Sequence, residues 1–271
     1  MHIVAWMVLL SSNDLEAYYI DMAIKSIIDH VDALYIQDQG CTDSTLDIAR
    51  KTVDNKIPLV IEENKTDLPR FHPDYAEPIF RSAALERAEE IFKPDFLLKI
   101  DADDVYTEYF YEQVKLLENQ GTFLLYNSLR HSSERFITPE YRSQSPHARQ
   151  IVDGVPFYDA HIHFWKAGLN VRFVKNPGQT GWFHNVLQPV PEPVLWLPGI
   201  CNIHLHRSFG PKAFKFWAEG GDVFEETIPF NPRRQAPQWF NSQMNMGYAV
   251  RTDFQWPAYI MEKWKKWGVY E

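Results

Sequence analysis

The sequence predicts an α/β fold with a mainly parallel central sheet flanked by helices, followed by an irregular C-terminal extension. Apolar runs of strand length alternate with stretches of helical periodicity four times in the first half of the chain. Such alternation implies right-handed crossovers between parallel strands. Three expected strands end in polar loops, at 11–13, 38–43 and 101–104. Ligands of open α/β sheets bind beside the carboxyl ends of strands, so these loops can converge on one site.

The first two strand–helix pairs follow from hydrophobic periodicity. Residues 4–10 are apolar and form the first expected strand. Residues 15–30 repeat apolar side chains at helical spacing, which predicts an amphipathic helix. A short second strand at 33–37 ends in a polar loop, whose residues can cap a helix at 44–53.

The next elements continue the alternation. Residues 59–62 form a third expected strand, and a helix at 79–92 ends before Pro94 because proline cannot continue a helix. The remaining elements of this half are a strand at 96–100, a helix at 109–118 and a strand at 122–126.

The second half is less regular. We expect strands at 171–174 and 203–207, a helix at 211–219, and an irregular proline-rich connection over 188–198. No repeat, low-complexity tract or clear linker interrupts the sequence. We therefore expect a single domain over 1–271.

Composition narrows the setting and the partners. The 271 residues are 45% hydrophobic and 23% charged, which is typical of a globular protein. The net charge of −9 disfavours duplex nucleic acid and anionic membranes as partners. The two cysteines form no Cys-x-x-Cys pair and favour a reducing compartment. No signal peptide and no transmembrane segment is expected, so a cytoplasmic location is predicted.

The most informative segment is Phe96-Leu97-Leu98-Lys99-Ile100-Asp101-Ala102-Asp103-Asp104. An apolar run of strand length ends in three carboxylates, which repel one another unless a cation or a proton lies among them. Hard oxygen ligands suit Mg²⁺ or Mn²⁺, and Mg²⁺ usually binds together with a phosphate. The segment therefore predicts a divalent metal that holds a phosphorylated substrate. The simpler alternative is an acidic turn in which Asp103 or Asp104 caps the next helix.

Four other segments form an ordered series with the acidic segment along the chain. Ser11-Ser12-Asn13 follows the first expected strand, and Asp38-Gln39-Gly40-Cys41-Thr42-Asp43-Ser44-Thr45 follows the second. Arg81-Ser82-Ala83-Ala84-Leu85 lies on the third expected helix, and Tyr158-Asp159-Ala160-His161 precedes an apolar stretch. In order and spacing, residues 3–185 resemble the family 2-like glycosyltransferases of the GT-A fold. That family has an Asp-Asp-Gly-Ser-x-Asp-x-Thr loop, an Arg-Asn-x-Ala-Leu helix, an Asp-x-Asp segment, and a Glu-Asp segment that runs into a helix.

The resemblance implies a Rossmann-like GT-A domain. Its nucleotide-sugar-binding half would span 1–126, and its acceptor-side half with the C-terminal extension would span 127–271. The implied activity is metal-dependent transfer of a sugar, of the hexosyltransferase type and with inversion, from a nucleotide-sugar to an acceptor. The donor is most often a UDP-sugar, and the acceptor is a hydroxyl of a glycan or another molecule.

On the donor side, the resemblance implies that Asp103 binds the Mn²⁺ or Mg²⁺ that bridges the diphosphate. Asp101 would contact the ribose or the water shell of the metal, and Asp38 would contact the base or the ribose. The implied donor-binding residues are Ser11, Asn13, Asp38, Arg81 and Asp101.

On the acceptor side, Asp159 is the implied general base, which removes the proton of the acceptor hydroxyl during attack. A histidine from the C-terminal half often completes the metal shell in GT-A enzymes. His204 and His206 share one face of an expected strand, and His184 is the rival candidate. A structural role is the alternative for each. His161 and His163 lie close to Asp159 in the chain, and either is a candidate for the acceptor site. The alternative is that both lie on the polar face of a helix or strand.

Two other functions compete with sugar transfer. A nucleotidyltransferase would also use acids and a metal on an α/β sheet, but usually carries a glycine-rich basic loop after the first strand, which 11–14 lacks. A non-catalytic protein that binds nucleotides or glycans is the other alternative. Gln39 and Tyr158 keep it open, because they stand where the resembled family has acids.

Overall fold

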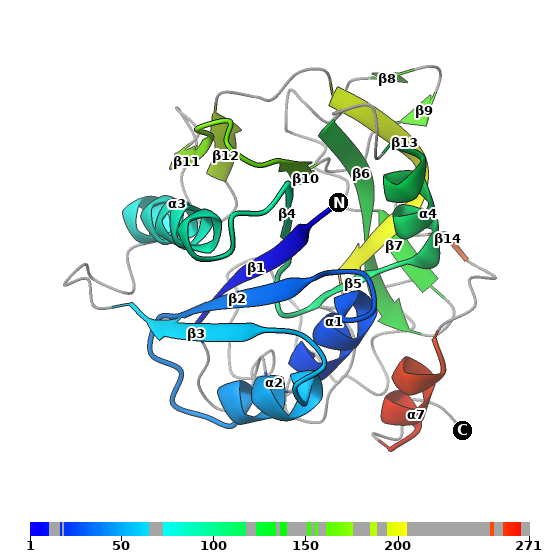
Figure 1. The fold of residues 1–271 in the computed structure, drawn as a ribbon. Coiled ribbons are helices and arrows are strands. Elements are labelled where there is room, and N and C mark those ends of the chain that lie inside the picture. Colours follow the sequence, from blue (N-terminus) through cyan, green and yellow to red (C-terminus); the bar gives the residue numbers. More distant parts are fainter. Residues whose placement is uncertain are drawn as a thin grey trace. The chain divides into compact units, whose positions relative to one another are not determined.

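Four parallel strands form the centre of the fold in this computed structural model (Figure 1). They are β1 (Ile3–Leu9), β2 (Ala33–Asp38), β3 (Leu59–Glu63) and β4 (Phe96–Lys99). Their order in the sheet is β3-β2-β1-β4, and each neighbouring pair is parallel. The predicted α/β fold with a mostly parallel, Rossmann-like sheet is therefore confirmed. In this order β1 lies between β2 and β4.

Antiparallel strands continue the sheet beyond β4. Strand β10 (His161–Lys166) pairs with β4, and the first part of β6 (Phe123–Ser133) pairs with β10. The resemblance implied a helix where β10 lies, and that expectation was wrong. Consecutive side chains of a strand point to opposite faces of the sheet. Phe164 and Trp165 accordingly enter two different hydrophobic cores.

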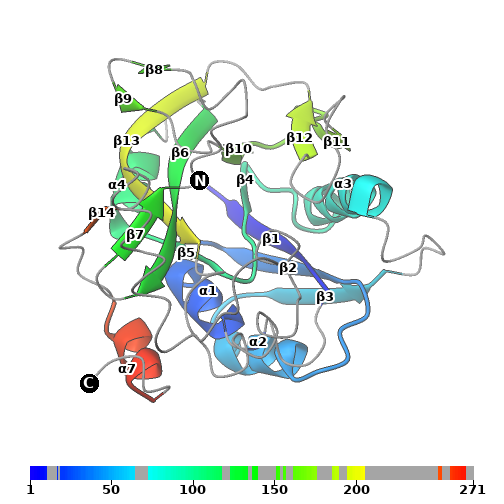
Figure 2. The same ribbon diagram turned by 180° about the vertical axis from the view of Figure 1, so that it is seen from behind.

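Helices cover both faces of the parallel strands (Figures 1 and 2). They are α1 (Ile20–Ile27) and α2 (Thr45–Val53) on one face and α3 (Pro73–Phe92) on the other. Helix α4 (Glu108–Leu117) follows β5 (Asp104–Tyr106).

The bounds of two helices differ from the predicted ones. The helix expected at 15–30 is α1, which ends at Ile27 because the N–H of His30 donates to the Ile27 carbonyl at 2.8 Å and closes a tighter turn. The helix expected at 79–92 begins earlier, at Pro73. Proline fits the first turn of a helix, where its missing N–H would have no partner in any case.

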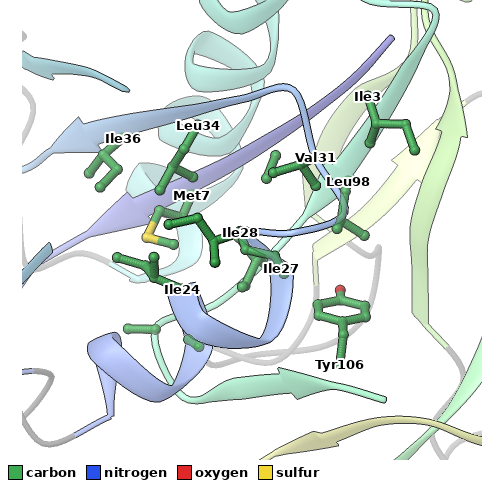
Figure 3. Packing of buried hydrophobic residues seen from close by; sticks show 14 of the residues in the cluster. Ile3, Met7, Ile24, Ile27, Ile28, Val31, Leu34, Ile36, Leu98 and Tyr106 are labelled. Atoms are coloured by element: carbon green, nitrogen blue, oxygen red, sulfur yellow. The ribbon is translucent and has the colours of Figure 1, made fainter. Parts of the chain in front are cut away.

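The side chains of β1 divide the core into two clusters. Ala5 and Met7 belong to a cluster with α1 and α2, whereas Val4 and Trp6 belong to a cluster with α3. Figure 3 shows Ile24 and Ile27 of α1, and Ile28 directly after it, close to Met7 of β1 and to Leu34 and Ile36 of β2. Because both faces of β1 are buried, its sequence is a continuous apolar run rather than an alternating one.

The structure describes residues 1–10, 17, 19–64, 73–117, 123–133, 136–139, 151–152, 155–156, 161–175, 185–188, 194–204, 250–251 and 257–266. The chain divides into two compact units. The first consists of 1–126 and 161–201, and the second of 127–160 and 202–271. The single continuous domain over 1–271 remains a prediction.

Shorter elements make up the rest of the described chain. In the first unit, β11 (Arg172–Lys175) and β12 (Asn185–Gln188) form an antiparallel pair. In the second unit, β7 (Phe136–Pro139) pairs with the later part of β6 and with β14 (Val250–Arg251). The other elements are β8 (Ile151–Val152), β9 (Val155–Pro156), β13 (Val194–His204) and α7 (Ala258–Lys266).

Strand β11 confirms the strand predicted at 171–174. Pro198, assigned from the sequence to an irregular connection, lies inside β13 instead. Proline is compatible with a strand where its missing N–H is not needed for pairing. The helix expected at 211–219 lies outside the described residues. Among the described helices, none has both the length and the hydropathy needed to cross a membrane.

His30 makes folding dependent on pH. Its ring stacks on Tyr111 with 3.6 Å between the ring centroids, and burial lowers the pKa of His30 below its ordinary value, against the opposing effect of Glu108. The unfolded chain therefore binds this proton more readily than the folded chain, so the free energy of unfolding falls as the pH drops through about 6.5. We expect the melting temperature to fall more steeply between about pH 7.5 and pH 5.5 in the wild type than in His30→Phe, which keeps a ring but cannot titrate. Equal slopes for the two proteins would contradict this prediction.

Candidate functional site

The three acids after β4 form a closed turn between β4 and β5. The N–H of Asp104 donates to the Asp101 carbonyl at 3.1 Å, and the N–H of Asp101 donates to Asp104 Oδ2, also at 3.1 Å. The Asp104 side chain is only 2% exposed, so this carboxylate faces inward. Asp103 lies at the tip of the turn and is half-buried.

Neither Asp103 nor Asp104 caps the next helix. Helix α4 begins at Glu108, and Thr107 precedes it. The Thr107 hydroxyl accepts the N–H of Phe110 at 3.4 Å, which is the capping contact at this end. The simpler reading of the acidic segment as a helix cap is therefore wrong, because β5 separates the acids from α4.

Two cations of the chain itself hold Asp101. Lys99 Nζ lies 2.6 Å from Asp101 Oδ2, and Arg81 Nη1 lies 3.3 Å from Asp101 Oδ1. Repulsion among the three acids is thus offset in part within the protein. Lys99 is 6% exposed, and sequence reasoning missed it. The available signal was a single charged residue inside the apolar run that forms β4.

Arg81 is placed by the packing of α3 against β11. The hydroxyl of the neighbouring Ser82 accepts the Phe173 N–H at 2.9 Å and donates to the Phe173 carbonyl at 3.2 Å. The Arg81 guanidinium carbon lies 5.9 Å from the centroid of the Phe173 ring. Helix α3 therefore presents Arg81 to Asp101 from a fixed position.

Asp38 shapes the loop after β2. Its Oδ1 accepts the N–H of Gly40 at 2.9 Å and that of Cys41 at 2.7 Å. Gly40 has φ of 103°, a backbone conformation that residues with a side chain rarely adopt. The glycine therefore allows the loop to fold back on the buried Asp38 carboxylate.

Gln39 occupies the position where the resembled family usually has a second acid. Its side chain is buried, donates from Nε2 to Gln37 Oε1 at 3.0 Å, and accepts at Oε1 from Asn64 Nδ2 at 2.5 Å. An amide can donate and accept at once, whereas an ionised carboxylate can only accept. This departure from the family pattern thus has a local structural reason.

The loop after β2 and the acidic turn after β4 lie at the same edge of the sheet. Asp38 is paired in register with Leu9 of β1, and Lys99 is paired with Trp6 of β1. Strands β2, β1 and β4 are parallel, so the loops that follow β2 and β4 flank the end of β1. The strand order reverses at β1, and such a switch point is where open α/β sheets bind their ligands.

Among the residues predicted for the site, the structure therefore places Arg81 beside Asp101, and it places Asp38 at the same sheet edge as Asp101 and Asp103. Of His204, only the backbone is described, as the last residue of β13. The other predicted site residues lie outside the described chain, namely Ser11, Asn13, Asp159, His184 and His206. Their roles stay predictions.

The described residues fit a cation that is bound in part by its substrate. Within the described ranges, no three His, Cys, Asp or Glu side chains are grouped as a ready-made metal site. Mg²⁺ is usually held by one or two carboxylates together with water and substrate phosphates, rather than by a cage of protein ligands. Asp103 offers the hard oxygen donor that Mg²⁺ or Mn²⁺ prefers.

Comparisons with known proteins yield similar solved structures only. No family model and no curated protein sequence matches the chain. S. aureus TarS, residues 1–349, is 15% identical and has a TM-score of 0.49, and the match covers 89% of this chain and 79% of that chain. A second structure of S. aureus TarS is 16% identical with a TM-score of 0.48, over 90% of this chain and 44% of that chain.

A third similar structure is glucosyl-3-phosphoglycerate synthase from Mycobacterium tuberculosis in complex with Mn²⁺, UDP and phosphoglyceric acid. It is 23% identical with a TM-score of 0.33, and the match covers 48% of this chain and 43% of that chain. TM-scores below 0.5 carry no argument about the fold. The fold class is assigned from the strand order of this chain.

Proposed function

We propose that this protein is a glycosyltransferase that moves a sugar, with inversion, from a nucleotide-sugar to an acceptor hydroxyl. The observation that carries the proposal is the position of the Asp38 loop and the acidic turn at the same edge of the sheet, on the two sides of β1. One loop follows β2 and the other follows β4, and both border the switch point of the sheet. This arrangement suits a nucleoside diphosphate, because the loop after β2 can contact the nucleoside while the acidic turn after β4 faces the charged phosphates.

On the donor side, Asp103 holds the divalent cation with the diphosphate of a UDP-sugar. When bound, Mn²⁺ or Mg²⁺ offsets the negative charge that develops on the leaving diphosphate. Asp38 contacts the base or the ribose, and Ser11 and Asn13 border the donor from the loop after β1. Arg81 approaches the nucleotide from α3.

Asp101 fits a supporting role better than direct coordination of the cation. Its two carboxylate oxygens lie against Lys99 and Arg81. An oxygen that accepts from an ammonium or guanidinium group is a weaker ligand for a second cation. Asp101 therefore contacts the ribose or the water shell of the metal, and it holds Arg81 beside the diphosphate.

On the acceptor side, Asp159 is the general base. The acceptor hydroxyl is a poor nucleophile until a carboxylate takes its proton during attack. One histidine among His184, His204 and His206 completes the metal shell. In this proposal residues 1–126 bind the nucleotide-sugar, and residues 127–271 provide the acceptor side.

The proposal is tested by nucleotide binding and by turnover. We expect UDP with Mn²⁺ to raise the melting temperature more than UDP alone or Mn²⁺ alone, because a ligand that binds only the folded state stabilises it. GDP and ADP, each with Mn²⁺, are the parallel probes for base preference. Hydrolysis of a panel of nucleotide-sugars then identifies the donor. A protein that no nucleoside diphosphate stabilises, with or without Mn²⁺ or Mg²⁺, would refute the proposed function.

A further inference from the structure

Three buried side chains hold the acidic turn from inside: Asp104, which belongs to the turn, and Tyr106 and His163; they are here called the turn support. Asp104 and Tyr106 are two residues apart on β5, so their side chains lie on the same face of that strand. His163 comes from β10, which pairs with β4 in the antiparallel direction. The strands that carry the turn support therefore lie on both sides of the turn.

Tyr106 ties β5 back to the end of β4. Its hydroxyl donates to the carbonyl of Lys99 at 2.5 Å, across the base of the turn. Its backbone N–H donates to the hydroxyl of Ser26 on α1 at 3.1 Å. Figure 3 shows Tyr106 near Ile27 and Leu98 at the margin of the apolar cluster. Both ends of Tyr106 are therefore fixed by buried hydrogen bonds.

The hydrogen bonds around Tyr106 determine the proton position on His163. Nδ1 of His163 lies 2.8 Å from the Tyr106 hydroxyl oxygen. A hydroxyl has one proton, and the Lys99 carbonyl can only accept, so the Tyr106 proton points to Lys99. His163 must then donate from Nδ1 to Tyr106. The same Nδ1 lies 3.8 Å from Asp104 Oδ2, the oxygen that accepts the Asp101 N–H.

These contacts form one path from β10 to the tip of the turn. His163 holds the Tyr106 hydroxyl and faces the Asp104 carboxylate. Tyr106 fixes the last residue of β4, and Asp104 fixes the backbone of Asp101. Loss of any one of these three side chains would shift Asp103, even if the side chain itself contacts no ligand. In metal sites, residues that orient the ligands typically contribute about ten- to a hundredfold to metal affinity.

We propose that Tyr106 and His163 are positioning residues, which hold the acidic turn in the geometry that binds a cation with a nucleotide diphosphate. This role rests on the proposed function, because it concerns the same site. From the sequence, His163 was a candidate for the acceptor site, and Tyr106 was not a candidate for any site.

The test compares two pairs of variants. Tyr106→Phe removes only the hydroxyl, and Tyr111→Phe is its matched control. The Tyr111 hydroxyl is also buried and donates to the Ser26 carbonyl of α1 at 2.8 Å, whereas the Tyr106 hydroxyl donates to Lys99 at the base of the turn. His163→Leu removes the donor, whereas His163→Asn can place an amide N–H near the position of Nδ1.

We expect Tyr106→Phe and His163→Leu to weaken UDP binding in the presence of Mn²⁺ about tenfold, and to leave UDP binding without metal unchanged. Tyr111→Phe and His163→Asn should bind as the wild type does. In the metal-free proteins, the amides of residues 100–104 should exchange hydrogen faster in Tyr106→Phe and His163→Leu than in their two controls.

Several outcomes decide between the proposals. If wild type binds UDP with Mn²⁺ and the four variants bind equally well, the positioning role is wrong and the proposed function stands. If the wild type binds no nucleoside diphosphate, the proposed function fails. Hydrogen exchange still tests the turn support in that case: equal exchange at residues 100–104 in Tyr106→Phe, His163→Leu and their two controls would refute it. If Tyr106→Phe does not fold, the comparison of His163→Leu with His163→Asn gives the answer.

Discussion

Replacing Asp103 with asparagine is expected to abolish the thermal stabilisation that Mn²⁺ adds to UDP binding, while the protein keeps its fold. Asp103 is half-buried at the tip of the turn, and asparagine has nearly the same shape. The substitution removes the anionic oxygen that would hold the cation. Because a metal supplies several kcal/mol of charge stabilisation to a leaving phosphate, turnover of the nucleotide-sugar should fall about a hundredfold or more.

Asp47→Asn is the control for this change in charge. Asp47 is an exposed acid on α2 that pairs with Arg50 at 3.2 Å. Thermal unfolding of each protein with UDP, with and without Mn²⁺, measures the effect. A full Mn²⁺-dependent shift in Asp103→Asn would remove Asp103 from the metal site, and with it the central role of the acidic turn.

The central sheet was predictable because its signals are local. Strands β1 and β4 are buried on both faces, so each is a short apolar run that ends in polar residues. The convergence of the Asp38 loop with the acidic turn then follows from the parallel order of the strands. Candidate residues at the ends of these strands could therefore be named before the structure was known.

The contacts that shape the site were not predictable in the same way. The turn support joins Tyr106 to His163, which lies 57 residues further along the chain, and the pairing depends on an antiparallel strand where a helix was expected. Ser82 binds the backbone of Phe173 over a separation of 91 residues. Sequence periodicity carries no information on such partners, because it reports only which face of an element is buried.

The acidic segment shows this limit most directly. Three neighbouring acids predicted that a cation or a proton lies among them, and two cations of the chain itself lie against Asp101. Lys99 adjoins the acids in sequence, but only the structure shows that its ammonium group turns to Asp101. Arg81 arrives from α3, and its distance to Asp101 depends on the packing of α3 against β11.

The pairing of Lys99 with Asp101 leads to the second large expected effect, on stability. Asp101→Asn leaves the Lys99 ammonium group, whose side chain is 7% exposed, without its carboxylate partner. Removing one partner of a buried ion pair typically costs about 3 to 5 kcal/mol, and the partial exposure of Asp101 places our expectation near the lower value. Denaturant unfolding, monitored by tryptophan fluorescence, should therefore show a loss of about 3 kcal/mol in the free energy of unfolding.

Adding Lys99→Met to Asp101→Asn should recover most of that loss, because the double variant no longer buries an unpaired charge. Asp47→Asn, which breaks the exposed pair with Arg50, should cost about 0.5 kcal/mol or less. The double variant should still lack the full UDP affinity, since Arg81 has lost the carboxylate that holds it. A double variant as unstable as Asp101→Asn would mean that Asp101 supports the fold through contacts other than the ammonium group of Lys99.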